Sequence, residues 1–266
     1  MCVHGRVIET HIKGDAMDRK YLLTTIASAI AFFLAAPTLA EVSITETGNR
    51  ICIKSDGLPN HSTGQFPNRG NPHSIIAQNI SACVPANPSK RNRATEIDRG
   101  AIGIGLNGVM FRPEAADYWD PDSQRGFSRR NTGWRLEPMG PDNIFGLDAN
   151  NAHVDRRGLY HYHGKPKGLL ASANGSHVGY AADGFEIHYI GAKAQSGWVL
   201  KSGTRPSGPA GRYDGSYVQD YAYVGGSGRL DRCNGGQLNG KFVYFVTEDF
   251  PYYPRCLWGS IGSGFR

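Results

Sequence analysis

Two histidines separated by a single tyrosine form the most chemically suggestive part of this sequence. His161 and His163 lie in the segment Gly158-Leu159-Tyr160-His161-Tyr162-His163-Gly164. In an extended strand alternate side chains point to the same face, so both imidazoles would share one face and the two tyrosines the other. Two imidazoles on one face can bind a single metal ion. The spacing fits equally well two strand histidines that hydrogen-bond to backbone or carboxylate groups, and both interpretations stay open.

A third histidine, His153, precedes the pair by a short polar segment. Val154-Asp155-Arg156-Arg157-Gly158 is typical of a turn, which would bring His153 back toward the pair. Three imidazoles suit zinc, copper, iron or nickel, whereas calcium and magnesium prefer oxygen ligands. The pattern therefore predicts a transition-metal site, and zinc or copper is the expected cofactor.

A group of polar residues follows further along the chain. Asp183-Gly184 predicts a turn into a strand over residues 185–190, on which Glu186 and His188 share one face. Asp183 or Glu186 is the expected general base if a metal activates a water molecule, and His188 is a possible further ligand. The alternative is a turn aspartate followed by exposed strand residues. His73 and His177 lie among Gly, Asn, Pro and Ser residues and are expected to be exposed loop histidines outside the site.

The first forty residues predict export. A charged start at 17–20, an apolar run over 22–36 and small residues up to Ala40 are typical of a secretory signal peptide cleaved after Ala40. Met17 is the expected true start, and residues 1–16 are an upstream extension. The apolar run is shorter than the roughly twenty residues of a membrane-spanning helix. We therefore expect a secreted or periplasmic protein without a stable membrane anchor, and an uncleaved signal is the alternative.

Four cysteines follow Ala40, namely Cys52, Cys83, Cys233 and Cys256. An even number in an exported chain predicts disulfides, and the pairing that is local in sequence joins Cys52 to Cys83 and Cys233 to Cys256. None lies near the three histidines in sequence or forms a Cys-x-x-Cys pair, which argues against thiolate metal ligands.

The 35 glycines and 15 prolines are spread along the chain, and apolar periodicity of the helical kind is scarce after residue 41. Glycines and prolines at this frequency predict a mainly β, sandwich-like single domain over 41–266, built of many short antiparallel strands with few short helices. The alternative is a domain boundary in the long loop expected at 201–216. Expected local elements are hairpins over 42–54 and 101–111, the second with a type I′ turn at Asn107-Gly108, strands over 185–190 and 242–247, and short helical turns at 113–119 and 143–151.

The net charge of +6, with histidine neutral, is too mild to imply a nucleic-acid partner. The basic residues are scattered. Clusters at 90–93 and 129–130 are typical of solvated loops.

Several motifs together resemble the YHYH domain family, a group of largely exported bacterial and eukaryotic proteins. The resemblance runs from about residue 50 to 259 and rests on five segments: 59–61 with 64–68, 102–109, 152–153 with 158–163, 182–185, and 250–256. It implies no particular activity, because the family takes its name from the motif. It adds His61, in Pro59-Asn60-His61, as a candidate metal ligand. His188 departs from the family, whose members more often have tyrosine there.

Three functions fit the sequence. The first is an exported metal protein that uses His153, His161 and His163, with His61 or Asp183 completing the shell. The second is a non-catalytic module that binds glycans or other envelope material through exposed aromatic residues. The third is a metal-free hydrolase with a histidine base, Asp183 as its orienting group, and Ser176 or water as the nucleophile. The aromatic candidates for the second function are Trp119, Trp134, Tyr213, Tyr217, Tyr221 and Tyr223.

Overall fold

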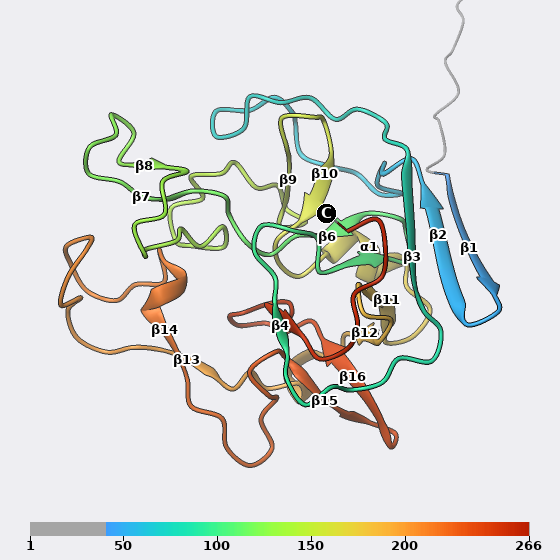
Figure 1. The fold of residues 1–266 in the computed structure, drawn as a ribbon. Coiled ribbons are helices and arrows are strands. Elements are labelled where there is room, and N and C mark those ends of the chain that lie inside the picture. The colour runs from blue at the N-terminus through green and yellow to red at the C-terminus, as the bar shows by residue number, and fades with distance from the viewer. Residues whose placement is uncertain (1–40, 266) are drawn as a thin grey trace, which may run out of the picture. The chain divides into compact units, whose positions relative to one another are not determined.

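One α-helix and two short 3-10 helices interrupt an otherwise β-rich chain in the computed structural model, which describes residues 41–265 (Figure 1). The helices are α1 (Lys167–Ser172), η1 (Gly191–Lys193) and η2 (Val218–Asp220). The expected signal peptide, the start at Met17 and the upstream extension lie outside the described residues. Within residues 41–265 no helix is long and apolar enough to cross a bilayer. The expectation of a mainly β fold of many short strands is confirmed.

An eight-stranded sheet forms the centre of the fold, in the order β15-β16-β12-β11-β5-β6-β10-β9. Its neighbours are antiparallel except for two pairs, β10 with β6 and β12 with β16, which are parallel. The strands are β5 (Gly103–Gly105), β6 (Met110–Phe111), β9 (Ala152–Val154), β10 (Tyr160–Tyr162), β11 (His177–Ala181), β12 (Glu186–His188), β15 (Gly235–Leu238) and β16 (Lys241–Phe245).

Four smaller sheets surround the central one. The largest has three antiparallel strands in the order β1-β2-β3, and the others pair β13 with β14, β17 with β4, and β7 with β8. Their strands are β1 (Val42–Thr47), β2 (Arg50–Ser55), β3 (Ile80–Pro85), β4 (Thr95–Glu96), β7 (Tyr118–Trp119), β8 (Phe127–Ser128), β13 (Trp198–Leu200), β14 (Tyr221–Tyr223) and β17 (Cys256–Leu257).

Large aromatic side chains fill the core along the central sheet. Tyr160, Tyr162, Tyr244 and Tyr253 are all fully buried, and Phe111 stacks on Tyr253 with ring centroids 4.7 Å apart. The backbones of β5 and β11 approach closely, because a Cβ atom at Gly179 would lie 2.3 Å from the carbonyl oxygen of Ile104. Glycine is therefore required at this crossing, which accounts for part of the high glycine content.

The hairpin expected over 101–111 is present, but its turn is of another type. β5 pairs antiparallel with β6, the Gly108 N–H donates to the Gly105 carbonyl, and the Gly105 N–H donates to the Val109 carbonyl. Gly108 has a positive φ of 77°, whereas Asn107 does not. The turn is thus a three-residue loop with a glycine bulge rather than a type I′ turn. The Asn107 side chain is used elsewhere, in a hydrogen bond to the Tyr162 hydroxyl.

The two expected helical turns are absent from the structure. Residues 112–117 are irregular, and Glu114 extends to form an ion pair with Arg135. In the segment 143–151 only turns form, because Asn143, Gly146 and Asn151 all have positive φ, which interrupts a right-handed helix. The helix that does form, α1, spans only six residues, too few for a periodic apolar pattern to announce it.

The segment 201–216 is a loop, as expected, and it is held by a buried charge cluster. Arg205 donates from Nε to Asp220 at 2.8 Å and from Nη2 to Asp214 at 2.6 Å. Asp220 is fully buried. The long loop is therefore fixed at its middle rather than free along its length.

The cysteines form the local pairs, Cys52 with Cys83 and Cys233 with Cys256. The first pair joins directly opposite residues of β2 and β3. The second connects the segment before β15 to β17, across 23 residues of chain, and both of its cysteines are buried.

Removing the second bridge should measurably destabilise the protein. We expect Cys233→Ser/Cys256→Ser to lower the free energy of unfolding by about 3 kcal/mol, because the bridge no longer restricts a loop of this length in the unfolded chain. Urea unfolding under non-reducing conditions measures the change. A variant with the same unfolding midpoint as the wild type would contradict the pairing.

Candidate metal centre

A tight hairpin brings the three motif histidines together. β9 and β10 pair antiparallel with His153 directly opposite His161, and β10 also pairs with β6 (Figure 1). The turn between them is closed by Asp155, whose Oδ1 accepts hydrogen bonds from the backbone N–H groups of Arg157 and Leu159. Since side chains alternate along β10, His161 and His163 point to the same side as His153. We call these three residues the histidine triad.

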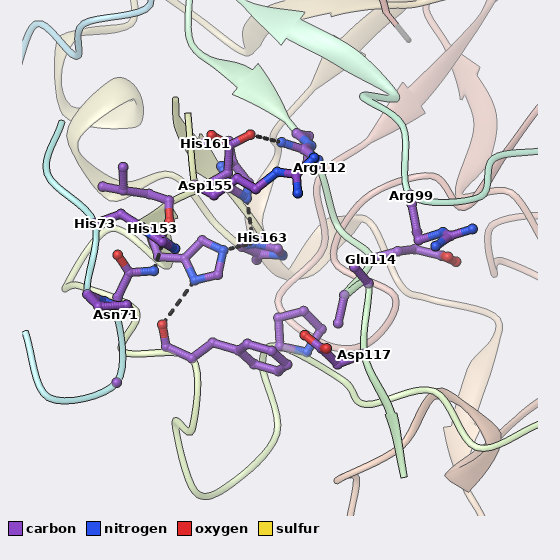
Figure 2. A pocket seen from close by; sticks show the side chains of 18 of the residues that line it. Asn71, His73, Arg99, Arg112, Glu114, Asp117, His153, Asp155, His161 and His163 are labelled. Carbon is purple, nitrogen blue, oxygen red and sulfur yellow. Dashed lines mark hydrogen bonds and ion pairs between the residues drawn. The ribbon is translucent and has the colours of Figure 1, made fainter. Parts of the chain in front are cut away.

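The ring nitrogens of the triad converge on one point (Figure 2). Nε2 of His163 lies 3.1 Å from Nε2 of His153 and 3.0 Å from Nε2 of His161. The three ring centroids are 4.6 to 4.7 Å apart, so they form a nearly equilateral triangle. His161 and His163 are buried and His153 is half-buried.

Backbone carbonyls set the tautomers of two of these rings. Nδ1 of His153 lies 3.0 Å from the Phe145 carbonyl, and Nδ1 of His161 lies 3.0 Å from the Leu159 carbonyl. A carbonyl only accepts, so both Nδ1 atoms carry a proton and both Nε2 atoms present a lone pair to the centre. Such outer hydrogen bonds orient histidine ligands in metal sites.

The third ring, His163, has no comparable hydrogen bond to set its tautomer. Nδ1 of His163 is buried and has no hydrogen bond of normal geometry, although the Pro113 carbonyl faces the ring. Lone pairs on all three Nε2 atoms, which lie within 4.8 Å of one another, would repel, so either a proton on His163 or a cation must lie between them. A tetrahedral zinc shell with Zn–N bonds of 2.0–2.1 Å places its nitrogens about 3.3 Å apart. The triad is close to that spacing without a metal.

All three imidazoles are held in the neutral, metal-binding form. Burial lowers the pKa of His153 and lowers the pKa values of His161 and His163 strongly, and the Arg112 guanidinium and the neighbouring rings add to the effect. A neutral imidazole is the form that coordinates a metal. The environment thus disfavours protonation of the triad.

The tyrosines of the same strand point into the core. The Tyr160 hydroxyl donates to Asp148 at 2.7 Å, and the Tyr162 oxygen lies 2.5 Å from Nε2 of His61. His61 also stacks on Tyr162 and is therefore on the face of β10 opposite to the triad. The structure does not bring His61 to the histidine triad, and its ring contacts a buried tyrosine instead.

A cavity of about 550 Å³ opens onto the triad, with all three histidines in its wall (Figure 2). Charged residues dominate the rest of the lining, with six arginines against three carboxylates. They are Arg99, Arg112, Arg125, Arg129, Arg156, Arg157, Glu114, Asp117 and Asp155. A ligand that entered this cavity would reach both the triad and the arginines.

Asp183 and Glu186 are not in this cavity. Asp183 is fully buried and accepts hydrogen bonds from the Tyr244 hydroxyl at 2.8 Å and the Gly259 N–H at 2.7 Å, so it joins β16 to the C-terminal segment. Glu186 accepts from Nε2 of His188 at 2.6 Å. The general-base role expected for Asp183 and Glu186, and the ligand role suggested for Asp183 and His188, therefore have no support in the geometry.

Glu114 is the carboxylate that sequence reasoning missed. It lines the cavity, forms an ion pair with Arg135, and lies 3.9 Å from Nη1 of Arg255. Burial raises its pKa despite these two arginines. Nothing in the sequence near Glu114 distinguishes it from a surface residue, because the arginines that surround it are distant in sequence.

His73 and Arg112 also belong to the cavity. His73 was expected to be an exposed loop residue, but it is half-buried and lines the same wall as His153. Arg112 follows β6 and forms a 2.9 Å ion pair with Asp155, in the turn between the histidines. The parallel pairing of β6 with β10 places them together, and no local sequence signal predicts that pairing.

The aromatic residues proposed for glycan binding are half-buried, except for Tyr223, which is exposed. Trp119 and Tyr217 line a second cavity of about 350 Å³ together with Phe127. Tyr221 lines a third cavity of about 590 Å³ and stacks on Phe250 with centroids 3.9 Å apart, and Trp134 packs edge-on against Tyr217. Trp119, Tyr217 and Tyr221 are thus the members of this set that border a cavity.

Acid should destabilise the metal-free protein through the triad. Below pH 6.5 the unfolded chain takes up protons at these histidines while the folded chain, with lowered pKa values, does not. The free energy of unfolding should therefore fall by about 1.4 kcal/mol per pH unit for each histidine, and His161→Gln should remove one such contribution. Urea unfolding between about pH 5.5 and 7.5 measures the slopes. NMR titration of the triad rings at or above pH 6.5 would contradict the account.

The histidine hairpin and its surroundings lie within a recognised sequence family. The family model described as "YHYH protein" matches residues 81–259, which is more than half of the chain. No match was found among curated proteins or among solved structures. The chain belongs to the YHYH protein family, and its Tyr160-His161-Tyr162-His163 segment supplies two histidines of the triad on one face and two buried tyrosines on the other.

Proposed function

We propose that this protein binds one transition-metal ion, zinc or copper, through Nε2 of His153, His161 and His163. The observation that carries the proposal is the convergence of these three nitrogens at 3.0 to 3.1 Å about His163. All described residues that could hold a metal together belong to this one group. Imidazole ligands suit zinc and copper, and neither ion needs an oxygen-rich shell.

Three protein ligands beside a cavity favour a reactive rather than a purely structural site. Structural zinc sites are usually closed by four protein ligands, whereas catalytic ones keep a position for water or substrate. Here the cavity lies against the triad. A metal-bound water in that position would be acidified and could attack a substrate, and Glu114 is the cavity carboxylate with a raised pKa that could accept its proton.

We propose that the protein acts outside the cytoplasm. Two disulfides in a small domain are typical of oxidising compartments, and the N-terminal sequence has the pattern of a signal peptide. Secretion and a periplasmic location fit these features equally.

A second candidate function is metal-free hydrolysis at a serine. The Ser176 hydroxyl lies 3.0 Å from Nδ1 of His188, and Nε2 of His188 lies 2.6 Å from Glu186. This series of hydrogen bonds differs from the one expected from the sequence, because Glu186 rather than Asp183 contacts the histidine. A serine, a histidine base and an orienting carboxylate form the arrangement of a nucleophilic catalyst.

The metal proposal predicts about one equivalent of zinc or copper per chain in the purified protein. His161→Ala/His163→Ala should lose it, because two of the three ligands are gone and affinity falls with ligand number. Plasma mass spectrometry on untagged protein measures the metal content. The matched control is His61→Ala, which alters a histidine on the opposite face of β10 and should keep the metal.

Two results would overturn the metal proposal. One is a wild-type protein that takes up no zinc or copper after reconstitution. The other is a folded double variant, checked by circular dichroism, that keeps its full equivalent of metal.

The serine candidate predicts covalent labelling by a fluorophosphonate probe that resists prolonged chelation. Ser176→Ala should abolish the label, because the probe bonds to the serine oxygen. Intact mass spectrometry counts the adducts, and Ser172→Ala, in the nearby helix, is the control. Absence of an adduct on folded wild-type protein would exclude this candidate.

A further inference from the structure

The cavity above the histidine triad has a strong positive charge. Its lining holds three more arginines than carboxylates, and two of the carboxylates are already paired. Asp155 accepts from Arg112, and Glu114 pairs with Arg135. Uncompensated charge in a partly enclosed space attracts anions, because low-dielectric walls concentrate the field.

Arg112 is the arginine nearest to the chemistry. Its positive charge helps to lower the pKa of all three triad histidines. For His161 it is the largest cause after burial. Its ion pair with Asp155 holds the side chain in place at 2.9 Å, and it is only half-exposed. Figure 2 shows Arg112 beside the triad. An anion at the open metal position would therefore also meet the guanidinium.

The remaining arginines surround the cavity at its exposed edge. Arg99, Arg125, Arg129, Arg156 and Arg157 are all exposed, and they come from three separate parts of the chain. Among the described residues Arg125, Arg129 and Arg156 form no ion pair. The planar guanidinium fork matches phosphate and carboxylate oxygens.

We propose that this cavity binds the phosphate group of an organic phosphate monoester, between Arg112 and the metal position. The inference rests on the proposed metal site, which supplies part of the positive charge. A phosphate monoester carries close to two negative charges at neutral pH, so it balances this excess better than a carboxylate or a sulfate ester. The volume of about 550 Å³ accommodates the phosphate together with a small organic group.

Two probes of the same shape and different charge test the proposal. Isothermal titration calorimetry with methyl phosphate and with methyl sulfate, on zinc-loaded full-length protein, should show tighter binding of the phosphate ester. Arg112→Gln should weaken methyl phosphate binding about tenfold, because a charge-assisted hydrogen bond is lost. Arg125→Gln/Arg129→Gln changes only exposed side chains and should weaken it about threefold, less at high salt.

The control is Arg91→Gln/Arg93→Gln, which removes two exposed arginines that do not line the cavity. It should bind methyl phosphate as the wild type does. Metal content is measured on every sample. If no metal is present but methyl phosphate still binds in an arginine-dependent way, the metal proposal fails together with the place of the phosphate at the metal position, and only phosphate binding by the arginines stands.

Three outcomes would overturn the phosphate proposal. They are no binding of methyl phosphate to zinc-loaded protein, methyl sulfate binding as tight as methyl phosphate, and equal binding by the wild type and both cavity variants.

Discussion

The alternation of side chains along β10 is the constraint on which the site depends. Because successive residues face opposite sides of the sheet, one strand sends His161 and His163 to a cavity and Tyr160 and Tyr162 to the core. A shift of one residue in the pairing with β9 would exchange the two faces. The buried hydroxyls of both tyrosines are hydrogen-bonded, so such a shift would also leave polar atoms unpaired.

The same burial that stabilises the strand keeps the histidines neutral, which is the form that the proposed metal site requires. Their pKa values are lowered because the charged form is poorly solvated there, and carbonyls fix two of the tautomers. The Nε2 atoms of the triad therefore point at one another, which is unfavourable unless a proton on His163 or a cation lies between them. Arg112 lies close enough to add to this effect. The arginine thus links the triad to the charge of the cavity.

Local patterns in the sequence predicted the parts of the site that are close in sequence. His153, His161 and His163 are within one hairpin, whose polar turn and two-residue spacing are visible in the sequence. The disulfide pairing was also local. Contacts between distant segments were not predictable: the parallel pairing of β6 with β10 brings Arg112 to the triad, and Glu114 lines the same cavity from an irregular segment where a helical turn was expected. The resemblance gave the presence of His61 but not its face, and in the structure its ring contacts Tyr162.

X-ray absorption at the zinc edge of the reconstituted protein tests the central claim most directly, because it reports the ligands rather than the presence of metal. The account predicts three imidazole nitrogens at about 2.0–2.1 Å, with one or two lighter scatterers from water or added anion completing the shell. Loss of two of those nitrogens in His161→Ala/His163→Ala would complete the assignment. A shell of oxygens alone, or of sulfur, would contradict binding by the histidine triad.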